Sequence, residues 1–356
     1  MCIFCRTFAA EINYSMALTR TYYRVAEHLF AVESSYSELL QCMTNYEPFA
    51  VEELLGERRE AKGERREGEE IFTLRVEKAI GERLKARGEE YTHVMTDTAD
   101  EDMPRIEVYH ATQLDTTRHD STPYTWLFRV AMVANAPICC ELECNEGFTE
   151  GVMRMSADCQ DVRFCVDNAL MLLFAFRTAP LMTLEMHAAV VVRPSLEDAT
   201  LQAKGERREV KGYLFLGYSG TGKSTHARMW LQAFPNAWLL NDDNPILRVM
   251  DDGEVRVYGS PWSGKTPCYN NAYARVGGIV KLSQAPCNKI RTISLPEAYA
   301  YMLSSASGLK MDRQMADQMH ETIKHVITHV KCYHLDCLPN TEAAEHCYQG
   351  MSAEPK

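Results

Sequence analysis

The sequence contains no long hydrophobic run. No apolar stretch among its 356 residues approaches the roughly 20 residues that a helix needs to cross a bilayer. Residues 1–16 also lack the basic start and the continuous apolar segment of a secretory signal peptide. These absences predict a cytoplasmic protein that makes no contact with a membrane.

Positive charge is also scarce. The chain has 38 Lys and Arg against 49 Asp and Glu, which gives a formal net charge of −11 at pH 7. Because a negative chain is repelled by the phosphate backbone, we expect no binding to nucleic acid. The length and the ordinary hydrophobic content of 46% allow two globular domains or one large one.

The 13 cysteines lack the paired spacing of a zinc ribbon, since the single CxxC motif at residues 2–5 has no second pair. With no export signal, we expect reduced thiols. Four residues at alternate positions of a strand-like run would share one buried face: Ile138, Cys140, Leu142 and Cys144. We therefore predict core packing and no structural metal.

The strongest motif is Gly-Tyr-Ser-Gly-Thr-Gly-Lys-Ser-Thr at residues 217–225, which fits the phosphate-binding pattern GxxxxGK[ST]. An apolar run at 213–216 predicts a buried strand before it, and residues 226–231 predict a helix after it. The candidate nucleotide-binding residues are Gly217, Ser219, Gly220, Thr221, Gly222, Lys223, Ser224 and Thr225.

The chemistry of a polyphosphate explains these residue types. Glycines let the backbone approach closely, and the open start of a helix supplies N–H donors with a favourable dipole. Lys223 would reach the outer phosphates of ATP, and the hydroxyl of Ser224 would bind Mg²⁺.

Two acidic residues, Asp242 and Asp243, follow a second predicted strand at 237–240. At a strand end, paired carboxylates can hold Mg²⁺ and take a proton from an attacking hydroxyl. The alternative is an Asn-Asp turn before Pro245. Coupled to the upstream phosphate loop, the pair predicts a catalytic role.

A second match to the bare pattern runs through residues 259–266, but Pro261 and Pro267 argue against a strand, loop and helix there. We interpret this match as false. Its Lys265 either neutralises charge on the transferred phosphoryl group, binds an acidic substrate, or is a solvated loop lysine.

The rest of the chain predicts two regions: 1–160, a mainly β accessory domain, and 161–356, a P-loop kinase-like domain. Strands are expected within 22–33, 106–109, 126–133, 138–144, 186–192, 255–258, 279–282 and 332–335, and helices at 162–176, 296–304, 311–330 and 341–348. The strand at 186–192 should pair with the one that enters the phosphate loop. A charged heptapeptide at 61–67 recurs at 203–209, with related copies at 56–60 and 81–84, and predicts solvated inserted loops.

A His-containing strand, the phosphate loop and Asp-Asp after the next strand together resemble the HPr kinase and phosphoenolpyruvate carboxykinase superfamily over residues 184–340. The resemblance implies an α/β fold with a mixed-sheet P-loop kinase core and a mainly β N-terminal region. It places His187 near the phosphates, Lys223 and Ser224 on phosphate and metal, Asp243 near the metal, and Asp242 as the base, with the order of the two acids open.

These observations predict an ATP-dependent kinase that phosphorylates a hydroxyl of an unknown small molecule or protein serine, with ATP and Mg²⁺ as cofactors. A homo-oligomer is compatible with this reading. Two alternatives stay open: a carboxykinase-type lyase and a non-catalytic nucleotide sensor. A GTPase is disfavoured because residues 288–291, Asn-Lys-Ile-Arg, end in the wrong residue for a guanine motif, and an ABC ATPase because no Leu-Ser-Gly-Gly-Gln segment follows.

Overall fold

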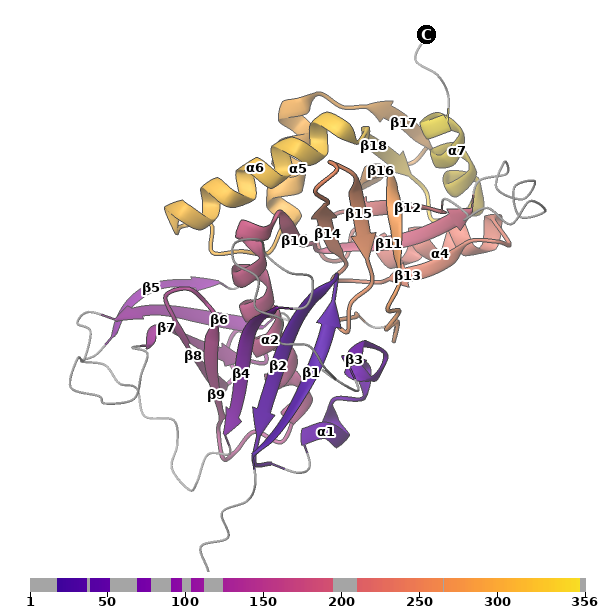
Figure 1. The fold of residues 1–356 in the computed structure, drawn as a ribbon. Helices are drawn as coiled ribbons and strands as arrows, with labels where there is room; N and C mark the ends of the chain where they lie inside the picture. The colour runs from indigo at the N-terminus through magenta and orange to yellow at the C-terminus, as the bar shows by residue number, and fades with distance from the viewer. Residues whose placement is uncertain are drawn as a thin grey trace, which may run out of the picture.

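Figure 1 shows the computed structural model of the chain. It describes residues 18–36, 39–51, 69–77, 91–97, 104–111, 124–194, 210–264 and 266–352. Over these ranges the chain is mixed α/β and mainly strand, with two large mixed sheets, which confirms the α/β class. The charged repeats and Lys265, for which the sequence made predictions, lie outside the described residues.

The first sheet contains nine described strands in the spatial order β3-β1-β2-β4-β9-β8-β7-β6-β5. In chain order they are β1 (Thr19–Val25), β2 (His28–Ser34), β3 (Ala50–Val51), β4 (Glu70–Glu77), β5 (Tyr91–Asp97), β6 (Arg105–Ala111), β7 (Tyr124–Ala131), β8 (Ile138–Asn145) and β9 (Glu150–Met155). Two short helical segments, α1 (Leu39–Cys42) and η1 (Thr44–Phe49), lie between β2 and β3. The predicted strands at 106–109, 126–133 and 138–144 are confirmed, whereas the run at 22–33, predicted as one strand, forms two antiparallel strands, β1 and β2, joined by a turn.

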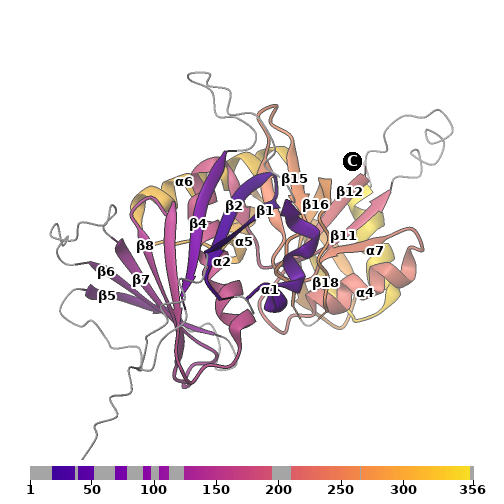
Figure 2. The same ribbon diagram turned by 60° about the horizontal axis from the view of Figure 1, so that its bottom comes forward.

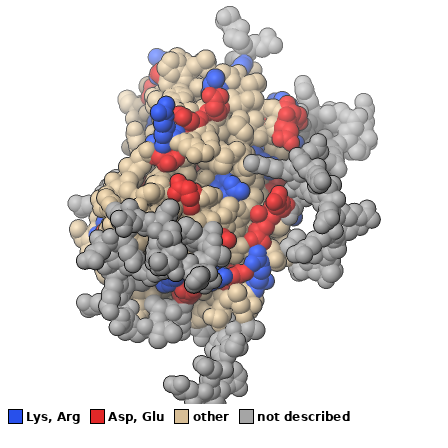
Figure 3. Space-filling view, turned by 60° about the vertical axis from the view of Figure 1, so that its left-hand side comes forward, with Lys and Arg blue, Asp and Glu red and all other residues tan. Residues whose placement is uncertain are grey.

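The two faces of this sheet differ in chemistry. Phe72 and Leu74, two positions apart on β4, are buried in the core, as the period of a strand requires. On the other face Arg129 of β7 pairs with Glu107 of β6 and Glu141 of β8. Figure 3 shows acidic and basic side chains next to one another on one side of the molecule. Cross-strand ion pairs of this kind help fix the register of the strands.

Helix α2 (Val162–Thr178), followed by the 3₁₀ turn η2 (Ala179–Leu181), packs against β4, β8 and β9 of the first sheet and against β10 of the second. Asp161 caps its start, because its Oδ1 accepts a hydrogen bond from the Phe164 N–H at 2.9 Å. Among the described residues, 162–181 is the one helix long and apolar enough to cross a membrane. This corrects the expectation from the sequence that no apolar run approaches that length. More than half of its most apolar stretch, 56%, is buried in the protein.

The second sheet also contains nine described strands, in the order β10-β14-β15-β16-β12-β11-β13, with β18 beside β16 and β17 beside β18. In chain order they are β10 (Thr183–Glu185), β11 (Ala188–Pro194), β12 (Val210–Leu216), β13 (Trp238–Asn241), β14 (Ile246–Val249), β15 (Val255–Tyr258), β16 (Tyr273–Gln284), β17 (Lys289–Thr292) and β18 (Cys332–Cys337). The predicted pairing of the strand before the phosphate loop is confirmed, since β11 and β12 are antiparallel neighbours.

Four helices cover the two faces of this sheet (Figure 2): α4 (Lys223–Ala233), α5 (Leu295–Ser305), α6 (Arg313–His329) and α7 (Thr341–Ser352). Trp230 of α4 and Cys347 of α7 pack with Phe215 of β12. Leu216, the next residue, packs on the opposite face in the same cluster as Met302 of α5. The helices predicted from the sequence are therefore present, one pair on each side of the sheet.

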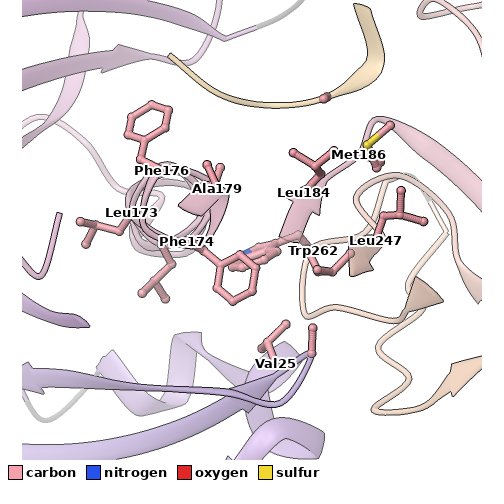
Figure 4. Close-up of a cluster of buried hydrophobic side chains, with 14 of the residues drawn as sticks. Val25, Leu173, Phe174, Phe176, Ala179, Leu184, Met186, Leu247 and Trp262 are labelled. Carbon is pink, nitrogen blue, oxygen red and sulfur yellow. The ribbon is translucent and has the colours of Figure 1, made fainter. Parts of the chain in front are cut away.

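The two sheets share one hydrophobic core. Figure 4 shows Val25 of β1, Phe174 of α2, Leu184 of β10 and Trp262 of the loop after β15 gathered in one cluster. The Trp262 indole, 2% exposed, donates a hydrogen bond from Nε1 to the Tyr46 hydroxyl at 2.8 Å. The boundary predicted at residue 160 thus falls beside a helix that contacts both sheets.

Candidate functional site

Four strands of the second sheet end at the same edge. β12 is parallel to β16, and β16 is parallel to β18. β13 also runs with β12, because both are antiparallel to β11. Ligands of α/β sheets bind outside the carboxyl ends of such strands. The phosphate loop and the Asp242-Asp243 pair leave β12 and β13 at this edge, and His187 enters β11 there.

The phosphate loop depends on two glycines in the left-handed region. Gly220 has a φ of +75° and Gly222 a φ of +107°, which other residues rarely adopt. A Cβ added to either would meet no atom within 4 Å, so this side of the loop faces open space. Gly222 is the N-cap of α4 and provides no side-chain cap. The N–H groups of the first helical turn are therefore open to an anion.

Lys223, the first residue of α4, is buried beneath the loop with 7% of its surface exposed. Its ammonium group donates to the carbonyl oxygens of Gly217 at 3.0 Å and Tyr218 at 3.4 Å. The same Nζ lies 2.9 Å from Nε2 of His187. Burial lowers the pKa of Lys223, and the negative charges of Asp243 and Asp242 oppose that shift.

His187 links this lysine to an acid. Its Nε2 lies 3.4 Å from Oδ1 of Asp243. Burial, and then the nearby Lys223 ammonium, lower the pKa of His187. Because an ammonium group can only donate, Nε2 accepts from Lys223, and the neutral ring carries its proton on Nδ1. The structure thus brings together three of the catalytic residues predicted from the sequence: His187, Lys223 and Asp243.

The turn that presents Asp243 is built by Asn241. Its Oδ1 accepts from the backbone N–H groups of Asp243 at 2.9 Å and Asn244 at 2.8 Å, and its amide donates to the Trp262 carbonyl at 3.0 Å. The turn alternative considered from the sequence is therefore real, and the same turn holds the acid at the site. Burial raises the pKa of Asp243. Its neighbour Asp242 is 4% exposed.

The remaining polar residues of the loop are exposed or half-buried. Ser219 and Gly220 are exposed, and so is Ser224 in the first turn of α4. The hydroxyl of Thr225 accepts a hydrogen bond from Arg228 at 3.3 Å. Within the described ranges, no group of three or more His, Cys, Asp or Glu is arranged to hold a metal. Mg²⁺ at nucleotide sites takes most of its ligands from phosphate and water, so a magnesium role for Ser224 and Asp243 stays a prediction.

Lys281 is a site residue that the sequence reasoning missed. It lies on β16 directly opposite Leu216, the last residue before the loop. Its Nζ is 4.8 Å from the ring centre of Tyr218 and 5.8 Å from that of Tyr301. Its charge is close enough to help lower the pKa of Lys223. A lysine inside the apolar run at 279–282 was visible in the sequence, but only the pairing of β16 with β12 places it beside the loop.

Glu185 is a second missed residue. It is 1% exposed, and neither carboxyl oxygen has a hydrogen-bond partner among the described residues. Burial, and then the charge of Asp243, raise its pKa well above the usual value. An acid two residues before His187 in a buried strand was visible in the sequence, but only the fold places it near Asp243.

No protein-family model matches the chain, and no curated protein sequence matches it.

Proposed function

We propose that this protein is an ATP-dependent kinase that transfers the γ-phosphoryl group to a hydroxyl of a small molecule or of a protein serine. The observation that carries the proposal is the chain of contacts from Lys223 to His187, at 2.9 Å, and from His187 to Asp243, at 3.4 Å. A phosphate-loop lysine beside an imidazole and a carboxylate combines a charge that stabilises phosphate with a group that accepts a proton.

The loop and two lysines bind the phosphates. The first-turn N–H groups of α4 and the loop backbone bind the phosphate oxygens, since Gly220 and Gly222 leave that side uncovered. Lys223 neutralises charge on the outer phosphates. Lys281, on the neighbouring parallel strand, brings a second ammonium group to the same edge of the sheet. The role predicted for Lys265, which lies outside the described residues, stays a prediction.

Asp243 accepts the proton of the acceptor hydroxyl. The oxygen of the acceptor hydroxyl forms a bond to the γ-phosphorus, the bond from that phosphorus to the β–γ bridging oxygen breaks, and ADP leaves. Asp243 takes the hydroxyl proton, and burial, by raising the pKa of this carboxyl, makes it a stronger base. We choose Asp243 over Asp242 as the base because Asp243 lies 3.4 Å from the His187 ring, beside the phosphate-loop lysine. This reverses the order implied by the resemblance.

A magnesium ion fits this arrangement. Hard oxygen ligands suit Mg²⁺, and the residues that would hold it are Ser224, at the start of α4, with Asp242 or Asp243. When bound, the ion supplies positive charge to the β- and γ-phosphate oxygens. The protein itself orients those phosphate oxygens between the start of α4 and Lys223.

The test is transfer of label from γ-labelled ATP with Mg²⁺ to the proteins and metabolites of a cell extract. The wild type should label an acceptor, and Asp243→Asn should lower the rate by about 100-fold or more, the usual contribution of a general base. Asp251→Asn, in an exposed turn, is the matched control and should keep the wild-type rate.

Two results would contradict the proposal. Equal transfer by wild type and Asp243→Asn would remove the acid from the mechanism. Binding of ATP with no transfer to any acceptor in the extract would favour the nucleotide sensor over the kinase.

A further inference from the structure

A cavity of about 550 Å³ opens beside the phosphate loop. One wall is the loop itself and the first turn of α4, including Gly220, Gly222 and Thr225. The far wall comes from the last residues of β16 and β18 and the residues that follow them. Both walls line the same cavity. A ligand whose phosphates lie on the loop can therefore extend through the cavity to the far wall. Its volume lies within the range of small-molecule and cofactor sites.

The far wall has a different chemistry from the loop. Ala285, Cys337, Leu338 and Pro339 present apolar surface there. Leu338 is 37% exposed, an apolar side chain turned toward solvent at the rim. The loop end of the cavity offers backbone N–H groups at a helix start, and the far end offers a surface for a flat, weakly polar group. A nucleotide matches this arrangement, because its phosphates are charged and its base is flat and weakly polar.

The cavity is preformed, because Gln284 ties its walls together. This residue ends β16, and its side-chain amide donates to the carbonyl oxygens of Gly220 at 3.2 Å and Thr221 at 3.3 Å. On the far wall, the Ala285 N–H donates to the Cys337 carbonyl at 3.2 Å. The distance between the loop and the apolar wall is thus fixed by hydrogen bonds before any ligand arrives.

We propose that this cavity binds the base and ribose of the nucleotide, with the base against Ala285, Leu338 and Pro339. The inference rests on the proposed function and adds the residues that distinguish a nucleotide from bare polyphosphate. The main rival surface is the ring of Tyr218, which is 72% exposed and does not line the cavity. The two placements put the base on different residues, so labelling can separate them.

The first experiment compares two ligands by isothermal titration calorimetry with Mg²⁺: ATP, and tripolyphosphate, which lacks base and ribose. The wild type should bind both, and ATP about ten-fold or more tightly, because only ATP buries a base. Ala285→Phe, which fills the cavity, and Leu338→Ser, at its rim, should each weaken ATP several-fold and leave tripolyphosphate unchanged. Leu295→Ser removes a leucine that is 55% exposed on α5 and serves as the matched control.

The second experiment is photolabelling with 8-azido-ATP, followed by peptide mapping. Label on the segment at 337–339 is the expected result, and label on Tyr218 would overturn the proposal. Equal affinity of the wild type for ATP and tripolyphosphate would also overturn it, while the phosphate site would stand. Failure to bind tripolyphosphate would instead contradict the phosphate site and thus the proposed function.

Discussion

At the scale of single residues, the site gathers titratable groups that are buried, such as Lys223 and Glu185, or half-buried, such as His187 and Asp243. Lys223 donates to His187 and Asp243 lies 3.4 Å from the same ring nitrogen, whereas Glu185 lies near Asp243 with no partner for either oxygen among the described residues. A buried acid without a partner favours its protonated form. The energetic consequence can be measured through the pH dependence of stability.

Glu185→Gln should change that pH dependence. The pKa of Glu185 in the folded protein lies well above 4.5, so from pH 4.5 upward the unfolded chain loses this proton while the folded chain keeps it. The contribution of Glu185 to wild-type stability therefore falls as the pH rises above 4.5, by up to about 1.4 kcal/mol per pH unit. Glutamine does not titrate, so the variant should gain on the wild type between pH 5 and pH 8 in urea unfolding. A constant difference over that range would contradict the assignment.

The titration of His28 should give stability the opposite pH dependence, because its contribution is lost as the pH falls. Burial first, and then the charges of Arg248 and Arg177, lower its pKa to about 3, and its Nε2 lies 2.9 Å from the Thr183 hydroxyl. Its contribution to stability is complete above pH 6.5, the ordinary value for histidine, and is lost as the pH falls from there toward 3.

His28→Gln should therefore unfold with a weaker acid dependence than the wild type in urea titrations at pH 7, 6 and 5. His346→Gln, on an exposed position of α7, is the control and should follow the wild-type curve. If His28→Gln follows it too, the buried histidine does not govern acid stability.

At the scale of elements, the sequence predicted the parts whose signals are local. The strand, loop and helix around residues 217–225, the strand before Asp242 and the buried helix α2 are all present, because hydrophobic period and glycine spacing act over a few residues. Lys281 and Glu185 could not be assigned, since only the pairing of β16 with β12 and of β10 with β14 brings them to the site. The order of strands in the sheet is a long-range property.

The glycine at the start of α4 provides a test at this scale. Gly222→Ala places a side chain at a φ of +107°, which costs about 1–2 kcal/mol. Gly253→Ala is a matched control, because Gly253 has a φ of +82° and also has room for a Cβ, with the nearest atom at 3.7 Å.

Both variants should lose similar stability, but only Gly222→Ala should lose affinity for tripolyphosphate. Equal affinity in the two variants, measured by calorimetry, would show that the loop conformation does not matter for phosphate binding.

At the scale of the whole molecule, the two sheets share one hydrophobic core. The turn between β1 and β2 reaches the second sheet, where the Tyr258 hydroxyl donates to Glu27 at 2.7 Å and Arg248 donates to the same carboxylate at 3.0 Å. The division at residue 160 was inferred from a change in strand and helix content. That change could not reveal that α2 and Trp262 pack in a core common to both sides.

Calorimetric unfolding should therefore show one cooperative transition. Trp262→Ala removes a side chain from the shared core and should destabilise the protein by about 3–5 kcal/mol, lowering the midpoint of the whole transition. Two separate transitions, with only one of them shifted in Trp262→Ala, would show that the regions unfold independently.

The proposed kinase requires the loop at 217–225 to bind the phosphates of ATP through Lys223. Titration of ATP with Mg²⁺ into wild type, Lys223→Met and Lys211→Met tests it most directly, because Lys211 is an exposed lysine near the opposite end of β12. We predict that Lys223→Met weakens binding by about 10- to 100-fold, the loss of one charge-assisted hydrogen bond, and that Lys211→Met binds like the wild type. No binding by the wild type, or equal binding by Lys223→Met, would contradict the account.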